Sequence, residues 1–190
     1  MTKSQLIEKV YRCIDEAYPN TDEASPDVEE FNIPALLEEA IRWVAKVVPI
    51  HALGSGTKLE GLKVPDNFLR IISFKGEDWK VPVTEILSQQ DPKYWQQRNP
   101  ALRGTNSRPI VFFVVKDGEL QFEPHPSGEE FILEESYYFG LPNMDDEFVY
   151  PDKLIDITAW KTAELIFSVM QDANGVSIAQ AQVASILPTL

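Results

Sequence analysis

Side chains with the types and spacing needed for chemistry on a substrate are scarce in this sequence. The best candidates for an enzyme or small-ligand site are His51, Asp66 and Trp79, around the first predicted strand. A nucleophile, its activating base and a group that orients the base occur together at no recognisable spacing. We therefore expect a protein that is not an enzyme and has no catalytic residues. A ligand-binding or enzymatic domain of unknown substrate is the alternative.

The segment Gly54-Ser55-Gly56-Thr57-Lys58 has the composition, but not the spacing, of a phosphate-binding loop. Such a loop needs the lysine directly after its last glycine, with a strand before it and a helix behind it. Here a strand-like segment follows, so we expect a turn and no phosphate-bearing cofactor.

Metal ligands are also poorly placed. With two histidines and one cysteine in the chain, zinc is not expected, and His125 is interpreted as an exposed turn residue. The acidic stretch 20–32 lacks the ligand order and the glycine of a calcium loop. The acidic triplet Asp145–Glu147 is typical of a solvated loop. The sequence therefore predicts no metal site.

Aromatic side chains in polar surroundings are the better candidates, as interaction residues. Tyr94 and Trp95 stand among four glutamines between positions 89 and 97. This setting favours a protein interface or plain packing, whereas stacking of a carbohydrate or a nucleic-acid single strand is the alternative.

Two residues around the first predicted strand have similar features. Trp79 lies beside a turn, where it either covers a hairpin or anchors an interface. Arg70, inside an apolar strand, requires a carboxylate. Local candidates or a neighbouring subunit could supply it, and the local ones are Asp66, Glu77 and Asp78.

The chain is strongly acidic. It carries 30 acidic and 17 basic side chains, a formal net charge of −13. Such a surface repels phosphate, which argues against a protein that reads nucleic acid through a basic face. The acidic surplus either serves solubility or forms a surface past which DNA moves without adhering.

The length of 190 residues suits one domain, which would bury roughly 70% of the surface of the unfolded chain. The single cysteine, Cys13, excludes an intrachain disulfide and is interpreted as a small apolar residue on a helix face. The longest apolar run, Ile110 to Val115, is far shorter than the roughly 20 residues that span a bilayer. The first residues, Met1 to Glu8, lack the apolar segment of a signal peptide. We expect a soluble protein without membrane contact.

Helical patterns occupy both ends of the chain. In residues 1–50, Thr2 and Gln5 form a capping box, and Pro34 fits the first turn of a second helix that ends before Pro49. We expect these two helices to pack as an antiparallel hairpin.

Residues 151–187 predict the C-terminal helices. The first is apolar on nearly all sides, so it must be buried by its own domain or by neighbouring protomers. Ser177 is the expected cap of the last helix, which is rich in alanine.

Strand patterns occupy residues 62–138. Apolar alternation from Leu62 to Val83 predicts a first hairpin, and a further strand is expected from Phe131 to Tyr137. Asp117-Gly118 predicts a tight turn between two more strands, which lie on either side of it. The polar, glycine- and proline-containing residues 88–109 are expected to form an arm between strands.

One stretch of the middle region resembles the sequences of a known protein family. The segments Val64–Lys75 and Asp78–Val83, continued by Asp91–Asn99 and Arg103–Thr105, are similar to small neck, ring or adaptor proteins of tailed bacteriophages, including phages of gut Bacteroidales. The layout is also similar, with two helices first and an alanine-rich helical tail last. In that family such proteins form rings under the portal and join the head to the tail.

The resemblance and the patterns together predict a single α+β adaptor domain, with N- and C-terminal helices in a bundle, a central antiparallel sheet and an extended arm. The resemblance implies a virion protein, made in the bacterial cytoplasm, that forms a homo-oligomeric ring of about twelve copies in the virion neck. Its partners would be the portal and an adjacent tail or neck protein, with DNA only passing through the channel. A host-encoded acidic adaptor that binds another protein without forming rings is the other alternative. The expected interface residues are Arg70, Trp79, Tyr94, Trp95, Arg98, Arg103 and Trp160.

Overall fold

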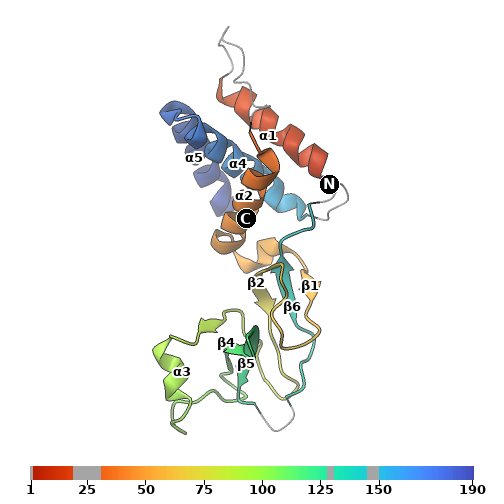
Figure 1. Ribbon diagram of the computed structural model, residues 1–190, viewed down its shortest axis with the longest axis vertical. Helices are drawn as coiled ribbons and strands as arrows, with labels where there is room; N and C mark the ends of the chain where they lie inside the picture. The colour runs from red at the N-terminus through yellow and green to blue at the C-terminus, as the bar shows by residue number, and fades with distance from the viewer. Residues whose placement is uncertain (1, 19–30, 128–130, 145–149) are drawn as a thin grey trace. The chain divides into compact units, whose positions relative to one another are not determined.

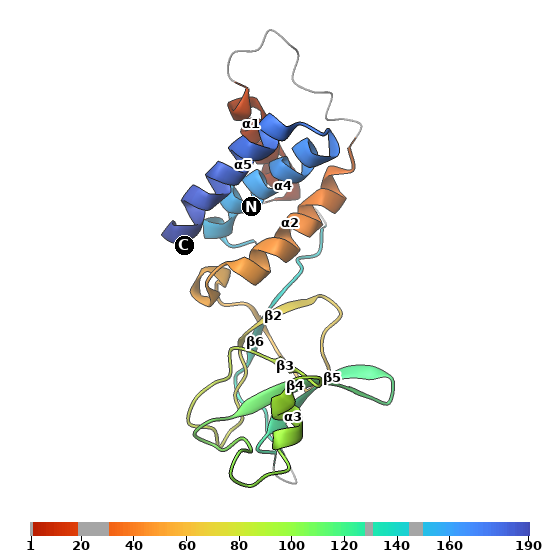
Figure 2. The same cartoon turned by 90° about the vertical axis from the view of Figure 1, so that its left-hand side faces the viewer.

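The computed structural model of the chain describes residues 2–18, 31–127, 131–144 and 150–190. They form an α+β fold with helices at both ends of the chain and strands in the middle, which confirms the predicted fold class (Figures 1 and 2). The chain divides into a helical unit, Met1–Gly54 and Leu141–Leu190, and a β unit, Ser55–Gly140. The triplet Asp145–Glu147 and all but the last two residues of the acidic stretch 20–32 lie outside the described residues.

The helical unit is built around one central helix. Its main helices are α1 (Lys3–Ala17), α2 (Ile33–Val47), α4 (Ile155–Val169) and α5 (Ala173–Ile186), with short 3₁₀ helices at η2 (Ile50–Leu53), η3 (Asp152–Leu154) and η4 (Leu187–Thr189). Helix α4 contacts α1, α2 and α5, and it buries side chains on all sides. The apolar circumference of α4 is therefore covered by helices of its own unit.

The predicted helix starts at the N-terminal end are confirmed. Gln5 N donates to Thr2 Oγ1 over 3.3 Å and Thr2 N donates to Gln5 Oε1 over 2.9 Å, which completes the capping box of α1. Pro34 lies in the first turn of α2. Among the described residues, no helix is long and apolar enough to cross a membrane.

One face of each N-terminal helix is buried in the unit. The buried residues include Leu6, Val10, Cys13, Ile14 and Ala17 of α1 and Leu37, Ala40, Ile41, Val44 and Ala45 of α2. Cys13 is only 1% exposed, and burial raises the pKa of its thiol to about 12. The thiol therefore packs as a small apolar group and does not ionise near neutral pH.

A largely buried ion pair joins three of the helices. Lys161 Nζ lies 2.8 Å from Glu164 Oε2, and Gln180 Nε2 of α5 donates to Glu164 Oε1 over 3.1 Å. Lys161 Nζ also lies 4.6 Å from the centre of the Trp43 ring of α2. Both charges of this pair thus have partners, as charges removed from water require.

The start of α5 differs from the prediction. Its N-cap is Asp172, not Ser177: Asp172 Oδ1 accepts from the backbone N–H groups of Asn174 and Gly175 over 3.1 and 3.0 Å. Tyr18, which follows α1, donates its hydroxyl to Asp172 Oδ2, and this hydrogen bond is the main cause that lowers the pKa of Asp172. The charged carboxylate of Asp172 accepts three hydrogen bonds, so the helix begins after Asp172 and not after Ser177, which lies five residues further on.

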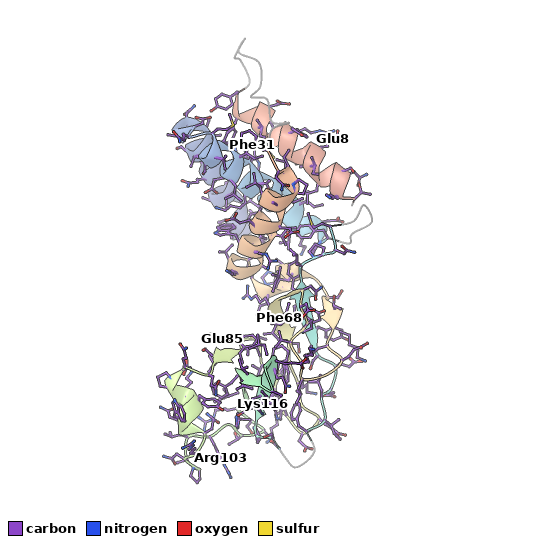
Figure 3. The ribbon with its side chains drawn as sticks, in the orientation of Figure 1. Glu8, Phe31, Phe68, Glu85, Arg103 and Lys116 are labelled. Atoms are coloured by element: carbon purple, nitrogen blue, oxygen red, sulfur yellow. The ribbon has the colours of Figure 1, made fainter. Side chains whose placement is uncertain are left out.

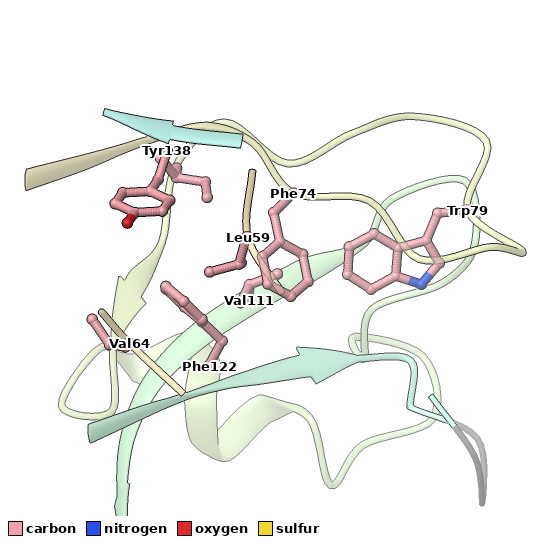
Figure 4. Close-up of a cluster of buried hydrophobic side chains, with 8 residues drawn as sticks. Leu59, Val64, Phe74, Trp79, Val111, Phe122 and Tyr138 are labelled. Carbon is pink, nitrogen blue, oxygen red and sulfur yellow. The ribbon is translucent and has the colours of Figure 1, made fainter. Parts of the chain in front are cut away.

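The β unit holds two three-stranded sheets. The first has the order β1 (Thr57–Lys58), β6 (Tyr137–Gly140), β2 (Phe68–Ser73), and its pairs are antiparallel. The second has the order β3 (Leu87–Ser88), β4 (Ile110–Lys116), β5 (Glu119–His125), with β3 parallel to β4. A cluster of buried side chains forms the core of this unit (Figure 4): Leu59, Val64, Ile71, Phe74, Trp79, Val111, Phe122 and Tyr138.

The predicted first hairpin is reduced to a single bridge between Phe74 and Val83. Strand β2 pairs instead with β6, which begins only at Tyr137 and not at Phe131. Two physical reasons account for this. Pro82 has no N–H to donate to a strand ladder, and β6 brings two large side chains, Tyr138 and Phe139, that are each only 6% exposed.

The predicted hairpin turn of the β unit is confirmed. Asp117 and Gly118 have φ of 54° and 80° and connect the antiparallel strands β4 and β5, as a two-residue hairpin turn requires. The turn predicted over Gly54–Lys58 is shorter than expected, because Thr57 and Lys58 form β1 and pair with Tyr138 and Tyr137.

Replacing Asp172 with alanine should lower the free energy of unfolding by about 1–2 kcal/mol, because α5 loses its cap and Tyr18 loses its acceptor. Ser177→Ala is the matched control and should change stability by at most a few tenths of a kcal/mol. Urea unfolding followed by circular dichroism measures both. Equal effects of the two substitutions would contradict the assignment of Asp172 as the cap.

Candidate functional site

The arm, residues 88–109, runs between β3 and β4 and is ordered along its length. It contains the short helix α3 (Pro92–Gln96), whose N-cap Asp91 accepts from Lys93 N over 2.8 Å. The backbone continues in hydrogen-bonded turns to Arg103, and Thr105 and Arg108 exchange two backbone hydrogen bonds. None of the residues of α3 is buried. The arm is therefore attached to the sheet without being part of its core.

Tyr94 attaches the arm to the second sheet. Its ring centre lies 5.2 Å from that of Phe112 on β4, with the two rings 81° apart. Phe112 is fully buried, pairs with Leu87 of β3 and has its ring centre 5.6 Å from that of His125 on β5. Phe112 thus joins the strand before the arm through its backbone, and the arm and β5 through its ring.

Gln97 and Gly104 fix the second half of the arm. Gln97 Oε1 accepts from Gly104 N over 2.7 Å, and Gln97 Nε2 donates to Lys93 O over 2.8 Å. A Cβ atom on Gly104 would lie 2.4 Å from the carbonyl oxygen of His125. Only glycine therefore lets the backbone of the arm approach β5 this closely.

The outer face of the arm exposes large side chains. Trp95 is 58% exposed and Leu102 is 53% exposed. The guanidinium carbon of Arg98 lies 5.1 Å from the centre of the Trp95 ring, in a cation–π contact. Tryptophan and arginine are the side chains that contribute most often to the energy of protein interfaces.

The arm also differs from the rest of the chain in charge. Of the 17 basic and 30 acidic side chains, the arm holds four basic and one acidic, which are Lys93, Arg98, Arg103, Arg108 and Asp91. The arm is thus net positive in a chain whose net charge is −13. None of its arginines forms an ion pair with a carboxylate of the described residues.

Two open depressions of the β unit adjoin each other and share Asn106, Pro126 and Ser127. The arm depression has a volume of about 410 Å³ and is lined by residues that include Gln97, Arg103, Thr105 and His125. The acidic depression has a volume of about 350 Å³ and is lined by residues that include Glu77, Asp78, Trp79, Phe131 and Ile132. A third depression, of about 490 Å³, is lined by residues that include Lys58, Asp66 and Tyr138.

The carboxylate of Glu123 lies between the side chains of Lys116 and His125. His125 Nε2 lies 3.0 Å from Glu123 Oε1, and Lys116 Nζ lies 2.9 Å from Glu123 Oε2. Burial acts to raise the pKa of Glu123, but the hydrogen bonds from Lys116 and His125 outweigh it and hold this pKa below its usual value. The contacts therefore stabilise the fold above the pKa of the unfolded carboxyl, and this stability is lost as the pH falls through the folded pKa.

Four of the seven expected interface residues come together on the arm. Arg103 is exposed there (Figure 3), Trp95 and Arg98 are exposed as well, and Tyr94 is half-buried against Phe112. The other three lie elsewhere: Arg70 is half-buried in β2, Trp79 is 4% exposed in the core of the β unit, and Trp160 is 6% exposed in α4. Of these seven residues, Trp95, Arg98 and Arg103 are the exposed ones.

The candidates for an enzyme site belong to different parts of the chain. His51 is in the helical unit, where its Nε2 lies 2.7 Å from Leu190 O. Asp66 and Trp79 belong to the β unit and line two different depressions. Over the described ranges, no group of three or more His, Cys, Asp or Glu side chains is arranged to hold a metal ion.

Sequence reasoning missed the residues that position the arm. Gln97 and Gly104 stand in the segments that carry the phage resemblance, but their contact is between backbone and amide and leaves no sequence pattern. His125 is half-buried and packs on Phe112, and is not the exposed turn residue that was expected. The alternation of β5, which places His125 on the same face as Glu123, was the available signal.

Comparison with known proteins gives no relative: neither a protein-family model nor a curated protein matches the chain. The similarity to phage neck proteins remains a prediction.

Replacing Gly104 with alanine should release the arm, because the new Cβ atom overlaps the backbone of His125. Overpacking of this kind costs about 1–3 kcal/mol, so amide hydrogen exchange within residues 92–108 should accelerate by about tenfold or more. Gly61→Ala is the control, since a Cβ there meets no atom within 4 Å. Unchanged exchange in the arm of Gly104→Ala would contradict the proposed contact.

Proposed function

We propose that this chain is a structural virion protein of a phage or prophage, which forms a closed homo-oligomeric ring in the virion neck between the portal and the tail. The ring would contain about twelve copies, with one face on the portal and the other on the adjacent tail or neck protein. DNA would only pass through its channel, past a surface to which the acidic surplus of the chain contributes.

The observation that carries this proposal is the exposed, positively charged arm. The arm is fixed at Phe112 and at Gly104, yet it exposes Trp95, Arg98 and Leu102. An ordered surface with exposed tryptophan and arginine suits a permanent protein contact, because little conformational entropy is lost on binding. Rings need such a contact between two different faces of neighbouring copies.

The combination of helices and arm supports the same proposal. The helical unit encloses its own apolar central helix, and the β unit carries the arm as an addition to its sheet. Family resemblance supplies the particular location in the phage neck. The alternatives are a ligand-binding or enzymatic domain, for which the open depressions of the β unit would be the starting point, and a host-encoded acidic adaptor.

Electron microscopy of the full chain, alone and mixed with the portal and tail components of the same genome, tests the proposal. We expect rings, either alone or on the portal, and permanent interfaces of about 2,000 Å² or more per contact. Compact particles that do not bind these components would refute the neck assignment. The next experiments would then be ligand screening or a search for a host partner.

Replacing residues 92–108 with a short glycine-serine linker should abolish the rings while the helical unit stays folded, as judged by helical circular dichroism. Gly61→Ala, on the same unit but away from the arm, should leave ring formation unchanged. Rings that persist without the arm would show that assembly uses another surface.

A further inference from the structure

The acidic depression has the chemistry of a receptor for a guanidinium group. Glu77 and Asp78 are exposed at this depression, and neither forms an ion pair with a basic side chain of the described residues. Phe131, which is half-buried, also lines it, and Trp79, which is only 4% exposed, packs against Phe131 with the two ring centres 5.5 Å apart. Carboxylates bind the planar fork of arginine, and an accessible aromatic ring such as that of Phe131 adds a cation–π contribution that a neutral side chain does not supply.

Apolar surface accompanies the two carboxylates. Ile132 lines the same depression and is 56% exposed. The backbone of this region is fixed, because Gly76 pairs with Leu133 and Glu77 N donates to Ile132 O over 3.1 Å. A partner that brings an arginine together with apolar side chains would therefore meet a preformed surface.

The arm presents that combination. Arg98 is exposed and its guanidinium carbon lies 5.1 Å from the centre of the Trp95 ring, which supplies exposed apolar surface beside it. Leu102 is a further exposed apolar side chain of the arm. Arm and depression therefore match in charge and in apolar character. Among the described residues, Arg98 forms no ion pair with a carboxylate of its own chain.

We infer that the arm of one copy binds a second copy of this chain by placing Arg98 in the acidic depression formed by Glu77, Asp78, Trp79, Phe131 and Ile132. The inference rests on the proposed ring, for which it supplies the contact between neighbours. Because the two surfaces are different patches of the same chain, the contact is heterologous, and its repetition around an axis closes a ring or extends a filament.

Nucleic acid is the competing partner for an exposed tryptophan beside arginines, since bases stack on such groups. The net charge of −13 disfavours it, because the rest of the chain repels phosphate. The net negative charge of the chain repels a nucleic acid, whereas the acidic depression of another copy attracts the positively charged arm.

A charge exchange between the two surfaces tests the inference on the full chain. Arg98→Glu and the double variant Glu77→Arg/Asp78→Arg should each weaken self-association by about tenfold or more in sedimentation velocity, with or without the portal and tail components. Mixed together, the two variants should associate again, because the unchanged arm of the second fits the unchanged depression of the first. Association of the unmodified chain should also weaken as salt is added. The Debye length, over which charges attract each other, shortens from about 10 Å at 0.1 M to about 3 Å at 1 M ionic strength.

Arg42→Glu is the matched control, because it makes the same charge reversal at an exposed position of α2 and should leave association unchanged. Circular dichroism checks that every variant is folded. If Arg98→Glu is unstable, Arg98→Gln takes its place in the measurement of self-association.

Three outcomes would overturn the inference. Rings that tolerate Arg98→Glu would overturn it and leave the neck function intact. An unmodified chain that never self-associates would overturn both. Loss of binding to a labelled single-stranded oligonucleotide in Arg98→Glu, with self-association unchanged, would assign the arm to nucleic acid.

Discussion

The arm depends on the packing of one buried ring, that of Phe112. The ring packs on Tyr94 and lies beside His125, while the backbone of Phe112 pairs with Leu87. Helix α3 has five residues and no buried side chain, so its own hydrogen bonds would not keep it folded in isolation. The core of the second sheet therefore sets the position of the arm. Exposed residues such as Trp95 and Arg98 are held on a base that loses little freedom when a partner binds.

Features encoded by residues a few positions apart were predictable from the sequence. The capping box at Thr2, the helix start at Pro34 and the Asp117-Gly118 turn are of this kind. Strand partners were not, because the pairing of β2 with β6 joins segments about seventy residues apart, in which the decisive difference is how much aromatic surface each possible partner buries. Strand β3 has two residues, too few for any periodicity to reveal.

The candidate surface was predictable in composition but not in exposure. Trp79 and Trp95 both stand beside polar residues in the sequence, yet Trp79 is 4% exposed and Trp95 is 58% exposed. The difference arises from Phe74, which lies five residues before Trp79, and above all from Phe131, which meets Trp79 from a distant part of the chain. The acidic depression could not be predicted for the same reason, since it forms only when Glu77 and Ile132 are joined through their backbones. The chemistry of the arm is local, whereas the surface that suits it is assembled by the fold.

The β unit is an insertion in the helical unit, and its first strand, β1, is hydrogen-bonded to its last strand, β6. In the unfolded chain, bringing α2 to α4 means closing a loop that contains the whole insertion, and the entropy lost in doing so grows with the logarithm of the loop length. When the insertion folds first, its paired ends shorten that loop to the nine residues between α2 and β1 and the fourteen residues between β6 and α4. Helices α2 and α4 then meet by closing a much shorter effective loop. The β unit would thus raise the folding rate of the helical unit by lowering its effective contact order.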